Sequence, residues 1–144
     1  MSKVILYMPN NASSVDNFIK SLSKASSDAR DWFLISTSPK SRIDFFAKRK
    51  IGDDGSGAVY AYFDKENEAL YVGETSRPIK SRMHDQTSPH KSTVWWESWE
   101  SVRFLQMKNR TDRLILELLL IIELQPKHNF KPGPRNFSDM FLNP

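Results

Sequence analysis

Runs of apolar residues broken by short polar segments predict a β-hairpin in the middle of the chain. Residues 58–63 and 69–74 are rich in aromatic and β-branched side chains, and the polar segment 64–68 separates them. Two runs of this composition joined by a short polar turn are typical of a hairpin. Residues 102–107 alternate apolar with polar side chains, which predicts a third strand.

The second half of the chain also predicts helices. A strongly apolar segment should begin at a cap formed by Thr111 or Asp112 and run to Leu124, because a proline follows two residues later. Apolar residues occur on every side of this segment, so we expect the helix to be buried all round. Residues 75–86 are expected to form a loop and then a helix, and residues 93–100 a short helix.

The first third of the chain predicts an alternation of strands and helices. Residues 3–8 and 32–35 are short apolar runs typical of buried strands. A helix capped by Ser13 or Ser14 should lie between them, and a second helix should occupy residues 38–50.

The strongest break in the pattern is the segment 52–57, which holds three glycines and two aspartates and cannot extend a helix or a strand. It divides the chain into an N-terminal α/β extension, residues 1–56, and a second part, residues 57–144. The chain has 144 residues, 39% of them hydrophobic, which fits one small core-forming unit with a short appendage.

Composition removes several classes of function. There is no cysteine, which excludes disulfide scaffolds, thiol nucleophiles and iron–sulfur clusters. The net charge of +4 mildly favours a polyanionic partner. The longest apolar block, residues 114–124, would span roughly 16 Å as a helix, about half of a bilayer core. With no apolar run at the start long enough for a secretory signal, we expect a cytoplasmic protein without a membrane partner.

Glu117 is the residue least suited to its surroundings, because it lies in the middle of the apolar segment 114–124. A buried carboxylate costs several kcal/mol unless a cation or a donor meets it. Two interpretations stay open: a structural ion pair with an arginine, or a ligand for a hard metal ion such as Mg²⁺. Glu123 lies about 240° around the same helix, so it should point elsewhere, to solvent or the helix end.

Two tyrosines and a group of basic residues are further candidates. Tyr60 and Tyr71 could lie on paired strands and face the same side, as site residues or as core aromatics. The basic group suits phosphate recognition, although such a stretch is also typical of a solvated face, and its two histidines could transfer protons. Its members are Arg77, Lys80, Arg82, His84, His90 and Lys91. Trp95 and Trp99 favour core packing over base stacking.

The order of these residues resembles the GIY-YIG nuclease family. Ala58-Val59-Tyr60 stands for its first motif and Tyr71-Val72-Gly73 for its second, and Arg82, Glu117 and Asn129 follow at similar gaps. The stretch 116–129, an apolar helix with Glu and then Gln-Pro-basic residues and Asn, is most similar to the nuclease domain of the bacterial excision-repair endonuclease subunit. The resemblance covers residues 57–130.

The resemblance implies an α+β fold in which helices flank a small central three-stranded antiparallel sheet. It also implies that Glu117 binds one Mg²⁺ (or Mn²⁺) and that Arg82 stabilises the charge developing on a phosphate. One of Tyr60 and Tyr71 would orient or deprotonate the attacking water, and the other would hydrogen-bond within the site. Asn129 would brace the site by hydrogen bonds.

The sequence departs from the family pattern at several positions. The first motif has Ala-Val-Tyr instead of Gly-Ile-Tyr, and Arg82 comes one position later than in many members, with Arg77 as the alternative phosphate ligand. Glu74 stands where the repair enzymes tend to carry Lys, which adds negative charge beside the expected metal ion. A His often follows the Arg, and either His84 or His90 could take that place.

These observations predict a stand-alone, metal-dependent DNA endonuclease of the restriction, phage or mobile-element kind. One alternative is a catalytically silent nucleic-acid-binding module on the same fold; another is a nuclease regulated by a protein partner. Cutting both strands would need a homodimer or two encounters. Residues 1–56 could add elements to the sheet, contact DNA or form a dimer interface.

Overall fold

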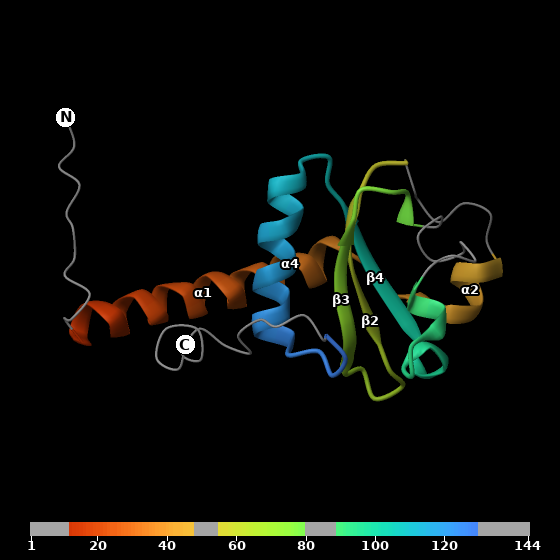
Figure 1. Cartoon of the computed structure of the whole chain (residues 1–144), viewed down its shortest axis with the longest axis horizontal. Helices are drawn as coiled ribbons and strands as arrows, with labels where there is room; N and C mark the ends of the chain where they lie inside the picture. Colours follow the sequence, from red (N-terminus) through yellow and green to blue (C-terminus); the bar gives the residue numbers. More distant parts are fainter. Residues whose placement is uncertain (1–11, 48–54, 80–88, 130–144) are drawn as a thin grey trace.

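The computed structural model describes residues 12–47, 55–79 and 89–129, and its centre is a four-stranded antiparallel sheet (Figure 1). The strands are β1 (Lys40–Ser41), β2 (Ala58–Phe63), β3 (Ala69–Thr75) and β4 (Ser101–Gln106), in the spatial order β1-β4-β2-β3. The predicted hairpin and third strand are therefore confirmed, and β1 adds a short fourth strand.

The β2–β3 hairpin forms because its two apolar runs pair across a turn that satisfies its own backbone. Asp64 accepts hydrogen bonds from the backbone N–H groups of Glu66 and Glu68, and Asn67 takes the left-handed backbone conformation that the turn requires. In the resulting register Tyr60 lies opposite Gly73. All residues of β2 are buried, because β3 and β4 flank the strand and both faces of the sheet are covered.

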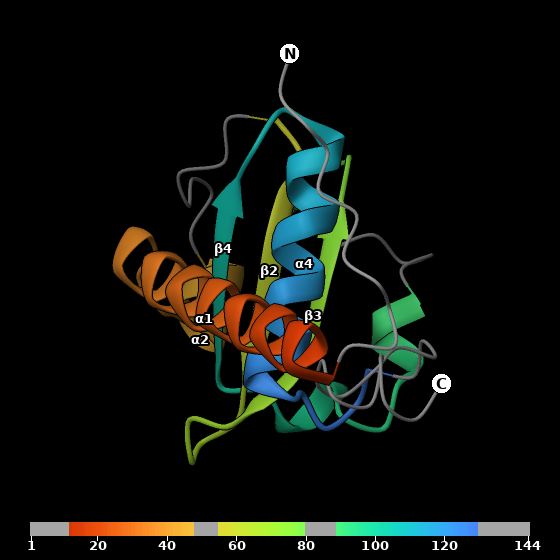
Figure 2. The same cartoon turned by 90° about the vertical axis from the view of Figure 1, so that its left-hand side faces the viewer.

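Two helices cover one face of the sheet. α4 (Arg110–Leu124) packs on β2 and β3, and α1 (Ala12–Ser36) crosses over α4 (Figure 2). The side chains between them form an aliphatic-rich core. Its buried members are Phe33, Val59, Ala61, Phe63, Ala69, Val72, Leu116 and Leu120. At the helix crossing, Glu123 accepts hydrogen bonds from Ser26 and Arg30.

The opposite face is covered by short elements and aromatic side chains. These elements are α2 (Arg42–Ala47), η1 (Pro89–Ser92) and η2 (Trp96–Ser98). Trp95 and Trp99 are fully buried there, which confirms that they pack in the core. The large aromatic side chains of this second core are Phe45, Tyr60, Tyr62, Trp95, Trp96 and Trp99.

The strand predicted at residues 32–35 is wrong, because these residues form the last turns of α1. The segment follows helical periodicity: Phe33 is buried in the aliphatic core, whereas Trp32 and Ile35 are exposed. The helix predicted for 38–50 is also too long. Lys40 and Ser41 pair with β4 first, and α2 starts only at Arg42.

α4 differs from its prediction in two respects. Its cap is Asn109, whose side chain accepts a hydrogen bond from the Asp112 N–H, because an Asn in extended conformation leaves its oxygen in reach of the first turn. The helix is also not buried all round, since only one of its faces meets the sheet. The apolar side chains left exposed on it are Leu114, Ile115 and Leu118.

Two other predictions lie wholly or partly outside the described residues. These are the strand at 3–8 and most of the helix at 75–86. The short helix expected within 93–100 is present as η2. None of the helices in the part of the chain that is described is long and apolar enough to cross a membrane.

Candidate active site

The two motif tyrosines lie together on the aromatic-covered face of the sheet. Tyr60 comes from β2 and is fully buried, and Tyr71 comes from β3 and is partly buried. Their ring centroids are 6.3 Å apart and the planes differ by 29°. The Trp95 ring stacks on the Tyr71 ring, with the two centroids 5.2 Å apart and the planes 13° apart.

His90 joins these tyrosines through a buried hydrogen bond. Its Nε2 atom and the Tyr60 hydroxyl oxygen are 2.7 Å apart, and its ring centroid is 5.0 Å from that of Tyr71. Only 3% of His90 is exposed. An imidazole within hydrogen-bond distance of a phenol can hold or pass its proton. Tyr60 is thus paired with His90, whereas His84, the other histidine considered, lies outside the described residues.

Gly73 makes room for the Tyr60 hydroxyl. The two residues lie opposite each other in the hairpin, and a Cβ atom on Gly73 would lie 2.6 Å from the Tyr60 hydroxyl oxygen. Real Cβ atoms do not approach that closely, so any larger residue would displace the phenol or the strand. The glycine of the Tyr71-Val72-Gly73 motif is therefore explained by the position of Tyr60.

Asn129 clamps the outer edge of β3. Its side-chain amide accepts a hydrogen bond from the Val72 N–H (2.9 Å) and donates one to the Val72 carbonyl (2.7 Å). The preceding backbone N–H groups, of Lys127 and His128, donate to the carbonyls of Ala69 and Leu70. Asn129 thus satisfies both backbone groups of the residue between Tyr71 and Gly73.

Glu117 approaches the hairpin from the other layer. It lies in α4 on the face that also carries Leu116 and Leu120, and only 7% of it is exposed. Leu116 and Leu120 pack against Val59 and Val72, whereas side chains alternate along β2, so Tyr60 points to the opposite face. Glu117 and Tyr60 are therefore held by different layers of the fold that meet at the same two strands.

A buried arginine that the sequence analysis did not single out ties α4 to β3. The Arg113 Nε atom lies 3.0 Å from a carboxylate oxygen of Glu74, and Nη1 donates to the carbonyls of Met107 and Lys108. Gly57 leaves space for this guanidinium, since a Cβ there would lie 2.7 Å from Arg113 Cζ. The available signal was an arginine four residues before Glu117, on the same helix face.

Arg113 offsets the negative charge that Glu74 was expected to add beside the metal ion. That carboxylate does not simply add negative charge to the site, because a guanidinium that is itself only 4% exposed pairs with it. Such a pair holds its two elements in register, and its loss would leave an uncompensated buried charge.

Comparison with known sequences places residues 56–130 in a protein family. A profile described as the UvrC-like GIY-YIG domain matches residues 56–130, more than half of the chain. The chain belongs to this family. GIY-YIG domains act on DNA, are typically phosphodiester hydrolases and generally use a divalent metal ion.

Several curated relatives are similar to about half of the chain or somewhat more. The UvrABC system protein C of Helicobacter acinonychis is 34% identical over 98 residues, which is 60% of this chain and 16% of that protein. The protein of the same name from Ruegeria sp. is 35% identical over 79 residues, 53% of this chain and 12% of the relative. The chain thus spans a small part of these relatives. No solved structure matches it significantly.

Of the remaining basic candidates, two lie in described parts of the chain and are exposed, and the others lie outside the described residues. Arg77 is exposed just after β3, where its backbone N–H donates to the Thr75 hydroxyl, and Lys91 is exposed beside His90 on η1. Lys80, Arg82 and His84 lie outside the described residues.

The donor set of this GIY-YIG domain suits a hard cation held by few protein ligands. Across residues 12–47, 55–79 and 89–129, no group of three or more His, Asp or Glu side chains could form a metal cage. Mg²⁺ is commonly bound by one or two carboxylates, with water and substrate phosphate as the other ligands. The buried carboxylate of Glu117 fits that mode of binding.

Proposed function

We propose that this chain is a divalent-metal-dependent endonuclease that hydrolyses DNA phosphodiester bonds. The observation that carries the proposal is the buried Tyr60–His90 hydrogen bond beside Tyr71, inside the GIY-YIG region. A buried phenol hydroxyl needs a hydrogen-bond partner, and here that partner is an imidazole, a group that can take up the phenol proton near neutral pH.

In the proposed reaction, Tyr60 orients or deprotonates the attacking water and His90 holds or receives the phenol proton. Tyr71 hydrogen-bonds within the site, and Arg82, with Arg77 as the alternative, opposes the charge on the phosphate. Lys80 and Lys91 contact the DNA backbone. Glu117 would hold Mg²⁺ (or Mn²⁺), which supplies Lewis-acid charge stabilisation when bound.

Asn129 and the Arg113–Glu74 pair would position these groups. Asn129 fixes the backbone of Val72, the residue between Tyr71 and Gly73. The ion pair fixes the first turns of α4, and Glu117 lies one turn further along that helix. Both contacts therefore set where the two layers of the site meet.

We further propose that the enzyme works as a stand-alone restriction, phage or mobile-element nuclease, with residues 1–56 as an accessory extension of the nuclease domain 57–144. Two contacts support this division of labour. α1 packs on α4 through Arg30 and Glu123, and β1 extends the sheet next to β4. The extension thereby stabilises the catalytic domain from its own chain.

The substitution at Glu74 favours one alternative, a catalytically silent DNA-binding module. Here the position that tends to carry Lys in the repair enzymes carries a carboxylate, and that carboxylate is engaged by Arg113. A silent module would bind DNA with a steep salt dependence and leave it intact.

The deciding experiment incubates supercoiled plasmid with the wild type, Glu117→Gln and Glu123→Gln, with Mg²⁺ or with a chelator. We expect the wild type and Glu123→Gln to cut in Mg²⁺ only, and Glu117→Gln to leave the plasmid intact. Glu123 is the matched control, because it lies in the same helix but pairs with Arg30 at the other end. Cutting by Glu117→Gln, or none by a folded wild type that still binds DNA, would overturn the proposal.

A further inference from the structure

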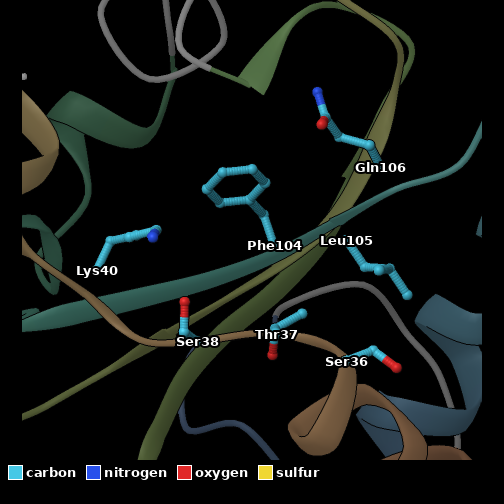
Figure 3. Close-up of a pocket in the computed structure, with 7 residues that line it drawn as sticks. All are labelled: Ser36, Thr37, Ser38, Lys40, Phe104, Leu105 and Gln106. Carbon is cyan, nitrogen blue, oxygen red and sulfur yellow. The ribbon is translucent and has the colours of Figure 1, made fainter. Parts of the chain in front are cut away.

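A pocket at the β1 side of the sheet lies between the N-terminal extension and the GIY-YIG region. Its volume is about 370 Å³, within the range of pockets that hold small ligands. Figure 3 shows residues from two segments around it. Ser36, Thr37, Ser38 and Lys40 come from the end of α1 and from β1, and Phe104, Leu105 and Gln106 come from β4.

The pocket adjoins the candidate active site across a single pair of strands. Phe104 lies directly opposite Tyr60 in the β2–β4 ladder, and its ring packs against the same aromatic core. Directly opposite residues have Cβ atoms about 5 Å apart. A substrate strand bound over the partly buried Tyr71 side of the candidate active site could therefore place a neighbouring nucleotide over Phe104.

The side chains around the opening have the chemistry of a nucleotide site. In Figure 3, Lys40 extends toward the partly exposed Phe104 ring, and the Ser38 hydroxyl points into the same space. Aromatic rings stack with bases, whereas lysines contact phosphates and hydroxyls bond to phosphate or sugar oxygens. The three groups thus offer one contact each to the base, the phosphate and a further oxygen.

Contacts within the protein hold the side of the pocket that the N-terminal extension forms. Nη1 of Arg103 donates to the carbonyls of Leu34 (3.0 Å) and Thr37 (2.8 Å). A few residues further along the chain, the backbone of Lys40 is held by its pairing with Val102 of β4. A preformed wall lowers the ordering cost of binding.

From this arrangement we propose that the pocket is a subsite for an unpaired nucleotide of the DNA substrate, with its base on Phe104 and its phosphate on Lys40. The base must be unpaired, because a base inside a duplex has no face free to stack on a protein ring. This inference rests on the proposed DNA-cleaving function and gives it a preference for DNA with a single-stranded segment next to the cut.

The test compares binding of two fluorescein-labelled DNAs, one duplex with a single-stranded overhang and one blunt, by anisotropy in chelator with the full chain. We expect the wild type to prefer the overhang DNA. Phe104→Leu should weaken overhang binding about tenfold with little effect on the blunt duplex, whereas Phe104→Tyr should keep the preference. Lys40→Gln should lower the salt slope by about one.

Matched controls separate the pocket from general surface effects. Trp32→Leu removes an exposed aromatic ring and Lys24→Gln an exposed lysine, both on α1, and both should bind DNA like the wild type. Since Phe104 contributes to the core, Ser38→Glu provides a second variant at an exposed position. Its added negative charge should abolish the overhang preference, whereas Ser23→Glu should not.

Three results would overturn the subsite: equal binding of the two DNAs by the wild type, wild-type behaviour of both Phe104→Leu and Ser38→Glu, or tighter binding of the same overhang made of RNA. These results are distinguishable from failure of the proposed nuclease function. If the nuclease proposal fails, the folded wild type does not cut plasmid in Mg²⁺, whatever its preference between the two DNAs.

Discussion

The two faces of the central sheet are built from different side chains for different tasks. The face under α4 and α1 is mostly aliphatic and is covered by long helices, whereas the other is aromatic and covered by short elements. Aliphatic side chains stabilise by burial alone, but Tyr60 and His90 carry polar atoms that must find partners in the core. The aromatic face therefore carries the buried polar groups that the proposed function uses, and both faces stabilise the fold by burying apolar side chains.

Glu117 is the proposed site residue that does not belong to the aromatic face. It is a buried carboxylate within the helix of the aliphatic layer, next to Leu116 in sequence. If the proposed function holds, the site forms only where the two layers meet. The contacts that hold the layers in register then become as important for cleavage as the groups that perform it.

On the aromatic face, the largest expected effect is that of Tyr60→Phe, which removes the hydroxyl that meets His90. We expect cleavage to fall about 100-fold or more, because proton transfer by a positioned group contributes on that scale. The measurement is the initial rate of plasmid nicking in Mg²⁺. Tyr62→Phe, on the same strand and face, is the matched control and should retain its rate. Equal losses in both variants would show that the face acts through packing alone.

Arg113→Met should be the most destabilising change, by about 3–5 kcal/mol, because it leaves the Glu74 carboxylate without its buried partner. Unfolding by urea measures the effect. The double variant Glu74→Gln/Arg113→Met should regain part of the lost free energy, since neither charge then remains, although the hydrogen bonds to the carbonyls of Met107 and Lys108 stay lost. Arg30→Met, which breaks the more exposed pair with Glu123, should cost clearly less. A similar loss in both single variants would contradict the ranking.

Asn129→Ala should cost about 1–3 kcal/mol, because Val72 loses two hydrogen bonds at the edge of the sheet. Asn129→Asp sharpens the test: its carboxylate can accept from the Val72 N–H but cannot donate to the Val72 carbonyl. We therefore expect it to be destabilised as well. Hydrogen exchange of the Val72 amide, followed by NMR, reports the clamp directly, and unchanged protection in Asn129→Ala would contradict it.

The smallest effect concerns the hairpin turn. A hydrogen bond from the Glu68 N–H lowers the pKa of Asp64 below its ordinary value. Burial opposes this effect, and the smaller effects of Lys127 and the Glu66 N–H lower the pKa further. Because the folded state binds this proton less tightly than the unfolded state, the stabilisation is present at neutral pH and lost as pH falls through the lowered pKa.

We therefore expect Asp64→Asn to melt about 2 °C lower than the wild type at pH 7. The difference should shrink when both proteins are melted in acid, near pH 3. A difference that stays constant with pH would show that the Asp64 charge contributes nothing to the stability of the turn.

The sequence alone was sufficient for elements whose signal is local. The hairpin around residues 64–68, the strand β4 and the apolar helix α4 were all predicted, because periods of 2 and 3.6 residues can be detected within one segment. The spacing of Tyr60, Tyr71, Glu117 and Asn129 also pointed to the right family. The hairpin, β4 and α4 follow from patterns among neighbours in the chain, and the family from the order of its motif residues, so neither needed knowledge of what each segment packs against.

Only the tertiary structure decided the rest. Residues 32–35 look like a strand in isolation, yet Phe33 is buried by α4 and the sheet as part of a helix. Tyr60 contacts His90, and Arg113 pairs with Glu74. The two residues of each pair are 30 or more positions apart in the sequence. Such contacts are set by which surfaces meet when the layers assemble, and no local pattern encodes that.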